Sequence, residues 1–141
     1  MTAKRDPGAS DVSGAPRAGR PALGRRAEDA AAALLESKGF RILERNWRLP
    51  TGELDLVADD GGTCVFVEVR SRTGSDFGHP LEAVSAHKRS RVVRAARHYL
   101  NEVAPVAEGF RFDVVGVLFA DADAAPECFH VRNAFEADGL I

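Results

Sequence analysis

The sequence predicts an α/β domain with the element order helix, three strands, helix and two strands. Three patterns predict it: helical spacing of apolar residues in 24–38, strand alternation on both sides of a Gly-Gly turn in 52–70, and a second helical stripe in 85–102. With 141 residues, 45% of them hydrophobic and 28% charged, the chain has the size and composition of one globular domain.

The first helix is expected from Gly24 to Lys38. Its apolar stripe consists of Ala27, Ala31, Leu34 and Leu35. Gly39 stands where a left-handed C-terminal cap would fall. Residues 1–22 carry almost no large apolar side chain, so we expect a disordered tail there and an ordered domain over residues 23–141.

A first strand at residues 40–47 is followed by a hairpin that brings two acids together. If Gly61 and Gly62 form a two-residue loop, Asp55 falls directly opposite Glu68, with Cβ atoms about 5 Å apart. A four-residue loop also keeps the two acids on one face, whereas a loop of odd length would separate them.

Carboxylates placed opposite each other repel unless a cation or a proton lies between them. Mg²⁺ suits this position because it prefers oxygen ligands and usually keeps several waters. Arg70 shares the face of Glu68, where its charge can stabilise a phosphate during hydrolysis. The pattern predicts a metal-dependent phosphodiesterase site. An ordinary salt-bridge ladder of Asp55, Glu68 and Arg70 on a solvated face explains the same spacing.

Glu28 lies on the apolar side of the first helix, on one stripe with Ala31, Ala32 and Leu35. It can complete a metal shell or orient a water. It can equally pair with Arg25, or be favoured by the helix macrodipole near the N-terminus.

The second helix, capped by Ser85, has a basic exterior. Residues 83–101 contain no acid and the basic side chains Lys88, Arg89, Arg91, Arg94 and Arg97. A further basic group precedes Glu28 and consists of Arg17, Arg20, Arg25 and Arg26. Arg72, in an expected loop at 71–79, can also meet phosphate. These patches indicate a polyanion partner, although a solvated basic face is the alternative.

Several classes of protein are disfavoured. No apolar run is long enough for a membrane helix, and the N-terminus lacks a signal-peptide pattern, so we expect a cytoplasmic protein without a membrane partner. Cys64 and Cys128 are expected to be buried free thiols in strand-like runs. His87, His98 and His130 have no carboxylate or cysteine at ligand spacing, so no metal is assigned to them.

The last strands are expected at 110–119 and 127–131, with a turn between them.

The element order, with an acid on the first helix, one on the second strand and Glu-x-Arg on the third, resembles the PD-(D/E)XK or restriction-endonuclease-like nuclease superfamily. The closer similarity is to the YraN-like family of bacterial proteins, which is related to Holliday-junction resolvases. It rests on the segments GRRAEDAAAALLESKGFRILERNWR, GELDLVA, FVEVRSR, FGHPLEAV and RFDVVGV and on the lysine of the second helix, and it covers about residues 23–135.

The resemblance implies a central mixed β-sheet flanked by helices and a role for each matching residue. Asp55 and Glu68 would be the metal ligands, the Val69 backbone carbonyl a further ligand, and Glu28 the third acid. Arg70 occupies the position of the catalytic lysine. An arginine there holds charge but cannot act as a base, because its pKa is about 12 or higher. A metal-bound water is already acidified, so hydrolysis does not strictly require that base.

Together these features predict a DNA-binding, endonuclease-like protein that hydrolyses structured or branched DNA with Mg²⁺ or Mn²⁺. DNA contacts are assigned to Arg25, Arg26, Arg72, Lys88, Arg91 and Arg94. The chain is also a candidate homodimer. One alternative is a noncatalytic DNA-binding or recombination-associated protein that retains the nuclease fold. Another is a protein-interaction module that uses the acidic C-terminal third.

Overall fold

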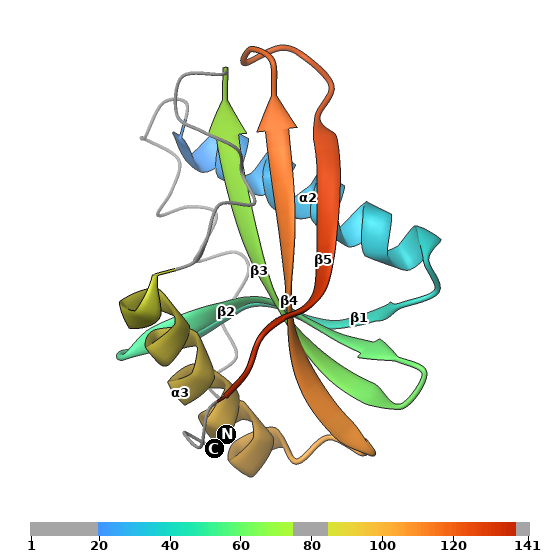
Figure 1. The fold of residues 1–141 in the computed structure, drawn as a ribbon, viewed down its shortest axis with the longest axis vertical. Helices are drawn as coiled ribbons and strands as arrows, with labels where there is room; N and C mark the ends of the chain where they lie inside the picture. The colour runs from blue at the N-terminus through green and yellow to red at the C-terminus, as the bar shows by residue number, and fades with distance from the viewer. Residues whose placement is uncertain (1–19, 75–84, 138–141) are drawn as a thin grey trace.

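The computed structural model describes residues 20–74 and 85–137. Its elements are α2 (Arg20–Ser37), β1 (Arg41–Leu49), β2 (Gly52–Asp60), β3 (Thr63–Thr73), α3 (Ala86–Val103), β4 (Gly109–Phe119) and β5 (Glu127–Phe135) (Figure 1). The predicted element order, and with it the α/β class, is confirmed.

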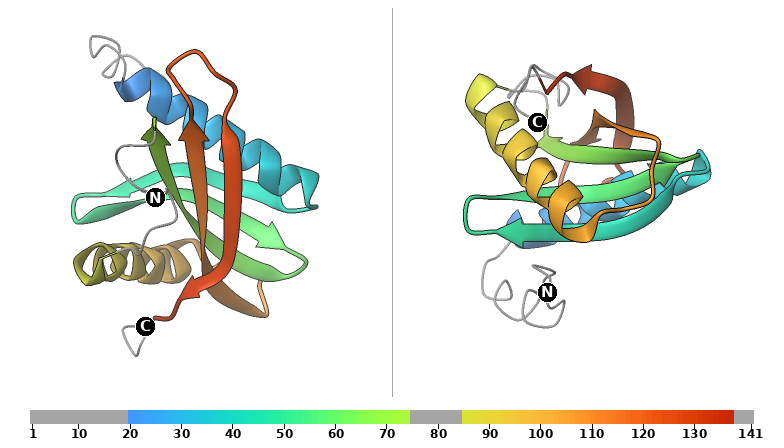
Figure 2. Two further views of the ribbon diagram at one scale, coloured as in Figure 1. Left: turned by 45° about the horizontal axis from the view of Figure 1, so that its top comes forward. Right: turned by 90° about the horizontal axis from the view of Figure 1, so that it is seen from below.

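The strands form one mixed sheet in the order β1-β2-β3-β4-β5. Strands β3 and β4 are parallel and are joined through α3, whereas the other neighbours are antiparallel. Helix α2 lies across one face of the sheet and contacts all five strands, while α3 packs on the opposite face against β2 (Figure 2). The sheet therefore has a hydrophobic core on each side.

The core under α3 contains Trp47, Leu54, Val57, Phe66, Val93, Tyr99 and Phe112, and the core under α2 contains Ala27, Ala31, Leu35, Leu56, Val65, Val67 and Phe119. In the first core the Tyr99 ring meets the rings of Trp47 and Phe66 edge to face, with the Trp47 and Tyr99 centroids 5.2 Å apart. Strands β2 and β3 contribute to both cores, which explains the unbroken apolar runs at residues 56–58 and 64–67. This packing fixes the hairpin on which the predicted acids lie.

The ends of the first helix differ in how well the sequence predicts them. Helix α2 begins at Arg20, so the last three residues of the predicted 1–22 tail are helical; residues 1–19 lie outside the described part. The cap after Ser37 is confirmed, because Gly39 has a φ of +93° and the Phe40 N–H donates to the Leu35 carbonyl at 3.0 Å.

The second helix begins as predicted, because the Ser85 hydroxyl accepts a hydrogen bond from the Lys88 backbone N–H at 3.2 Å. Two strands extend further than expected. Strand β3 continues to Thr73, into the predicted 71–79 loop, and the rest of that loop from residue 75 lies outside the described residues. Strand β5 continues past Val131 to Phe135.

Cys64 and Cys128 are free thiols, as expected; Cys64 is also buried as expected, whereas Cys128 is only half-buried. No helix within residues 20–74 and 85–137 is long and apolar enough to span a membrane.

Candidate metal and DNA site

The turn of the β2–β3 hairpin is the predicted two-residue loop. Gly61 and Gly62 both have positive φ, 58° and 103°, as this type of turn requires. The register continues from Asp60 opposite Thr63 to Leu56 opposite Val67 and ends there. The expected pairing of Asp55 with Glu68 is therefore not made as a ladder pair. Instead, an Asp55 carboxylate oxygen accepts the Val69 backbone N–H at 2.8 Å.

Strand β2 is irregular at Asp55, which explains why the ladder ends. Leu54 and Val57 pack in the same core, although alternation would place residues three apart on opposite faces. On the other side of β2, the pairing with β1 also omits Asp55 and its expected partner Asn46, whose φ is +54°. This irregularity turns the Asp55 side chain toward the backbone of β3, where its carboxylate accepts the hydrogen bond from the Val69 N–H.

A cavity of about 390 Å³ opens where β2 departs from β3. It is lined by Arg48, Leu49, Pro50, Gly52, Glu53, Asp55, Glu68, Val69, Lys88, Arg91 and Val92. The N–H and C=O of a residue in an extended strand point to the same side, so the Val69 carbonyl points toward β2 like its N–H. The predicted ligands Asp55, Glu68 and Val69 thus come from adjacent strands and meet at one cavity.

Both carboxylates are held in a position that disfavours two negative charges. Glu68 is only 5% exposed. The pKa of Asp55 is raised well above its ordinary value, first by burial and then by the negative charge of Glu68, although the Val69 N–H opposes the rise. The charges of Glu28 and Glu53 raise it further. A cation at this position would relieve the repulsion.

Lys88 provides one such cation from α3. Its ammonium nitrogen lies 2.9 Å from Oε2 of Glu68, whose side chain is 6% exposed, whereas the Lys88 side chain is 52% exposed. The Ser85 cap fixes the first turn of the helix that carries this lysine. Sequence reasoning placed Lys88 on a DNA-binding surface and missed its contact with the carboxylate pair.

Glu28 is half-buried on α2, and burial raises its pKa. Asn46 donates to its Oε1 at 2.9 Å, a partner that the sequence did not suggest. Within residues 20–74 and 85–137, no three acidic, histidine or cysteine side chains are grouped closely enough to bind a metal ion together. Glu28 influences Asp55 through its charge, and its assignment as a third acid stays a prediction.

Arg70 lies on β3 opposite Gly116, is half-buried, and does not line the cavity. Its role at the catalytic lysine position therefore stays a prediction. Arg72 donates to the Ser71 carbonyl at 2.8 Å. Arg26 donates to the Ala122 and Ala124 carbonyls and lies over the Phe119 ring, and so it ties α2 to the β4–β5 turn.

The other predicted DNA contacts are exposed. Arg91 and Arg94 point from α3, and Arg91 also lines the cavity. Arg25 is exposed on α2. The structure brings Lys88 and Arg91 to the acidic site and does not place Arg25 or Arg72 in its lining.

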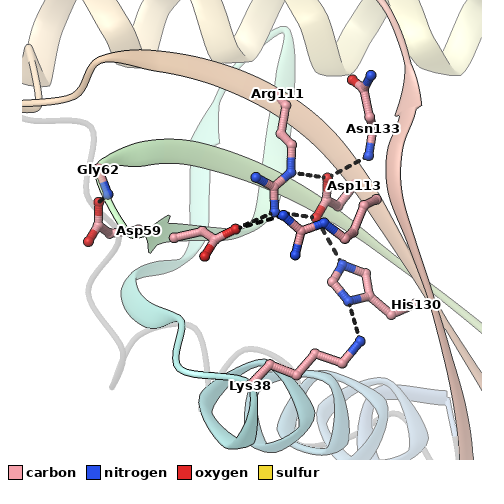
Figure 3. Close-up of polar contacts among 9 residues, drawn as sticks. Lys38, Asp59, Gly62, Arg111, Asp113, His130 and Asn133 are labelled. Atoms are coloured by element: carbon pink, nitrogen blue, oxygen red, sulfur yellow. Dashed lines mark hydrogen bonds and ion pairs between the residues drawn. The ribbon is translucent and has the colours of Figure 1, made fainter.

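A second polar cluster, centred on the fully buried Asp113 of β4, was not predicted (Figure 3). Its carboxylate accepts hydrogen bonds from Arg111 Nε at 2.9 Å, His130 Nε2 at 2.8 Å and the Asn133 N–H at 2.9 Å. His130 therefore has a carboxylate partner that its spacing in the sequence did not indicate. The sequence feature that could have indicated this cluster is Asp113 itself, a single acid among the apolar residues of the segment RFDVVGV.

These contacts also connect β2, β4, β5 and the turn that follows α2. Arg111 Nη2 reaches Oδ2 of Asp60 at 2.8 Å, and Lys38 Nζ lies 2.9 Å from His130 Nδ1. Since a lysine ammonium can only donate, Nδ1 is the acceptor and the His130 proton is on Nε2, facing Asp113. The hydrogen bonds outweigh burial and lower the pKa of Asp113.

Comparison with known proteins gives a consistent result. The sequence model of a family described as "Uncharacterised protein family UPF0102" matches residues 27–117. A UPF0102 protein of Anaeromyxobacter dehalogenans strain 2CP-C is 49% identical over 121 residues, which are 86% of this chain and 89% of the relative. A UPF0102 protein of Pelotomaculum thermopropionicum is 47% identical over 116 residues, 82% of this chain and 97% of the relative. The matched region includes Asp55, Glu68 and Lys88.

Proposed function

This chain belongs to the UPF0102 family, and we propose that it is a DNA-binding nuclease of the restriction-endonuclease-like, PD-(D/E)XK type. It hydrolyses phosphodiester bonds of branched or otherwise structured DNA with a divalent metal ion. The observation that carries the proposal is the meeting of Asp55, Glu68 and Val69 at one cavity, where β2 departs from β3. The resemblance of about residues 23–135 to that superfamily supports the choice of substrate.

The residues present fit Mg²⁺ or Mn²⁺. Asp55 and Glu68 offer carboxylate oxygens, the Val69 carbonyl offers a neutral oxygen, and hard divalent ions prefer this donor set. The pKa of Asp55 is raised first by burial and then by the charge of Glu68, and Lys88 compensates only one charge of this carboxylate pair. A bound ion would acidify a water and polarise the phosphate. The protein holds Asp55 in place through the Val69 N–H and excludes water from Glu68 by burial.

Cationic side chains on both walls of the cavity suit a phosphodiester. Arg48 of β1 and Arg91 of α3 line it together with Lys88. Both arginines are exposed, but Arg48 pairs with Glu53 at 3.2 Å, so we assign the phosphate contact to Arg91. Arg70 lies two residues after Glu68 on β3. Its guanidinium would stabilise the negative charge that develops on the phosphate during hydrolysis, without acting as a base.

A noncatalytic DNA-binding or recombination-associated role is the second candidate. Arg70 at the position of the superfamily lysine favours it, because the usual ammonium is missing from β3. The ion pair of Glu68 with Lys88 favours it as well, because an internal cation already compensates one of the two acids.

Cleavage of linear, nicked and four-way-junction DNA in Mg²⁺ and in Mn²⁺ tests the proposal. We expect metal-dependent cleavage by the wild type and none by Asp55→Asn, whose amide oxygen can still accept the Val69 N–H. Arg70→Lys should increase cleavage, since it restores an ammonium whose pKa can be tuned, and should leave DNA affinity nearly unchanged. If the wild type and Arg70→Lys bind every DNA form but cut none, the noncatalytic role is correct.

A further inference from the structure

The cavity holds its own cation, and that cation contacts one of the two proposed metal ligands. The Lys88 ammonium lies 2.9 Å from Oε2 of Glu68, and both residues line the cavity together with Asp55. Glu68 is nearly inaccessible to solvent, with a side chain 6% exposed, so it depends on this contact for charge compensation. Lys88 is half-exposed, so its ammonium can leave the carboxylate for water at little cost.

We propose that Lys88 competes with the divalent ion for Glu68: its ammonium holds the carboxylate in the metal-free protein, and metal binding releases it toward the substrate phosphate. The inference rests on the proposed metal-dependent function and names the residue that controls loading of that site. Sequence reasoning assigned Lys88 only to general DNA contact.

The charges at the site favour this exchange. Asp55 and Glu68 carry two negative charges when both are ionised, and Lys88 compensates only one of them. A divalent ion compensates both and leaves the ammonium in surplus. That surplus positive charge matches the single negative charge of a phosphodiester, so release of Lys88 would couple metal loading to DNA binding at the same cavity.

The backbone supports a side chain that moves while its helix stays in place. Lys88 is in the first turn of α3, where Ser85 accepts its N–H, and Val92 and Val93 of the next turn are buried in the core. The backbone of Lys88 is therefore fixed, and only the flexible stem has to turn. Arg91 follows one turn later, lines the same cavity and is exposed, which makes it a matched position of equal charge.

Mn²⁺ titration calorimetry on the full chain without DNA tests the inference. Lys88→Met removes the competing cation and should bind Mn²⁺ about tenfold more tightly than the wild type. Arg91→Met removes a charge from the same cavity and should change the affinity by less than about threefold. Lys88→Gln, which retains a donor for Glu68, provides a second variant if Lys88→Met does not fold, and it should also bind more tightly.

The outcomes separate the two proposals. If the wild type binds Mn²⁺ and Asp55→Asn does not, but both Lys88 variants bind as the wild type does or more weakly, the competition is wrong and the metal site stands. Equal gains in Lys88→Met and Arg91→Met would also overturn it, because general charge would explain the effect. If neither the wild type nor the Lys88 variants bind Mn²⁺, the metal site and the competition are both wrong. Binding by the Lys88 variants alone supports the competition.

Discussion

Replacing Asp113 by asparagine should destabilise the fold strongly, because its carboxylate compensates a half-buried arginine from a fully buried position. Asp113 is 0% exposed and the Arg111 side chain 15% exposed. Breaking one side of a buried, hydrogen-bonded charge pair costs about 3 kcal/mol. The NH2 group of the asparagine side chain is itself a donor. It would face the donors of His130 and Arg111 that now contact Oδ2 of Asp113, so these hydrogen bonds would be lost. For a domain of this size the loss corresponds to about 10 °C in melting temperature.

Urea unfolding followed by the fluorescence of Trp47, the single tryptophan and fully buried, measures the loss. Asp60→Asn is the matched control: its side chain is 25% exposed, it also pairs with Arg111, and it should cost about 1 kcal/mol. The pKa of Asp113 is lowered, so its contribution is present above the ordinary carboxyl pKa and is lost as pH falls through the lowered one. A loss below about 1 kcal/mol at neutral pH, or equal losses in both variants, would refute the reasoning.

Two further predictions concern the cavity and α3. Since the pKa of Asp55 is raised and a ligand carboxylate must be ionised, Mn²⁺ affinity should increase as pH rises through that pKa, with proton release visible in two buffers of different ionisation enthalpy; a pH-independent affinity would contradict Asp55 as a ligand. Arg91→Ala with Arg94→Ala should weaken DNA binding alike for all sequences and reduce the slope of log affinity against log salt by about two units, measured by fluorescence anisotropy. An unchanged slope would place the DNA surface elsewhere.

Local patterns predicted the elements because each is specified by nearby residues. The left-handed cap at Gly39, the Ser85 N-cap and the Gly61–Gly62 turn depend on backbone preferences within a few positions. The strand ends depend on distant partners instead. Strand β3 continues to Thr73 because Phe119 of β4 lies beside it, and β5 reaches Phe135 because Phe112 pairs with it. The spacing of apolar residues in the sequence gives no information about either of these strand pairs.

The acids of the site were predicted, and their geometry was not. The hairpin turn was sufficient to bring Asp55 near Glu68, but the irregularity of β2 requires Leu54 and Val57 to fill the same core. Lys88 reaches Glu68 only because α3 packs against β2. These two elements are not consecutive in the sequence, so local patterns do not predict their contact. Its helical position indicated an exposed charge, and position alone does not reveal which carboxylate a long side chain will reach.

Asp113 and Asp55 show that the direction of a carboxyl pKa shift depends on the partners of the carboxylate as well as on its burial. Asp113 is surrounded by donors from Arg111, His130 and the Asn133 backbone, and its pKa is lowered, so its charge stabilises the fold. Asp55 has one backbone donor and faces Glu68, and its pKa is raised. Asp55 and Glu68 nevertheless lie together at the lining of one cavity. A pair of carboxylates in which one has a raised pKa is expected where a cation or a substrate supplies a further interaction.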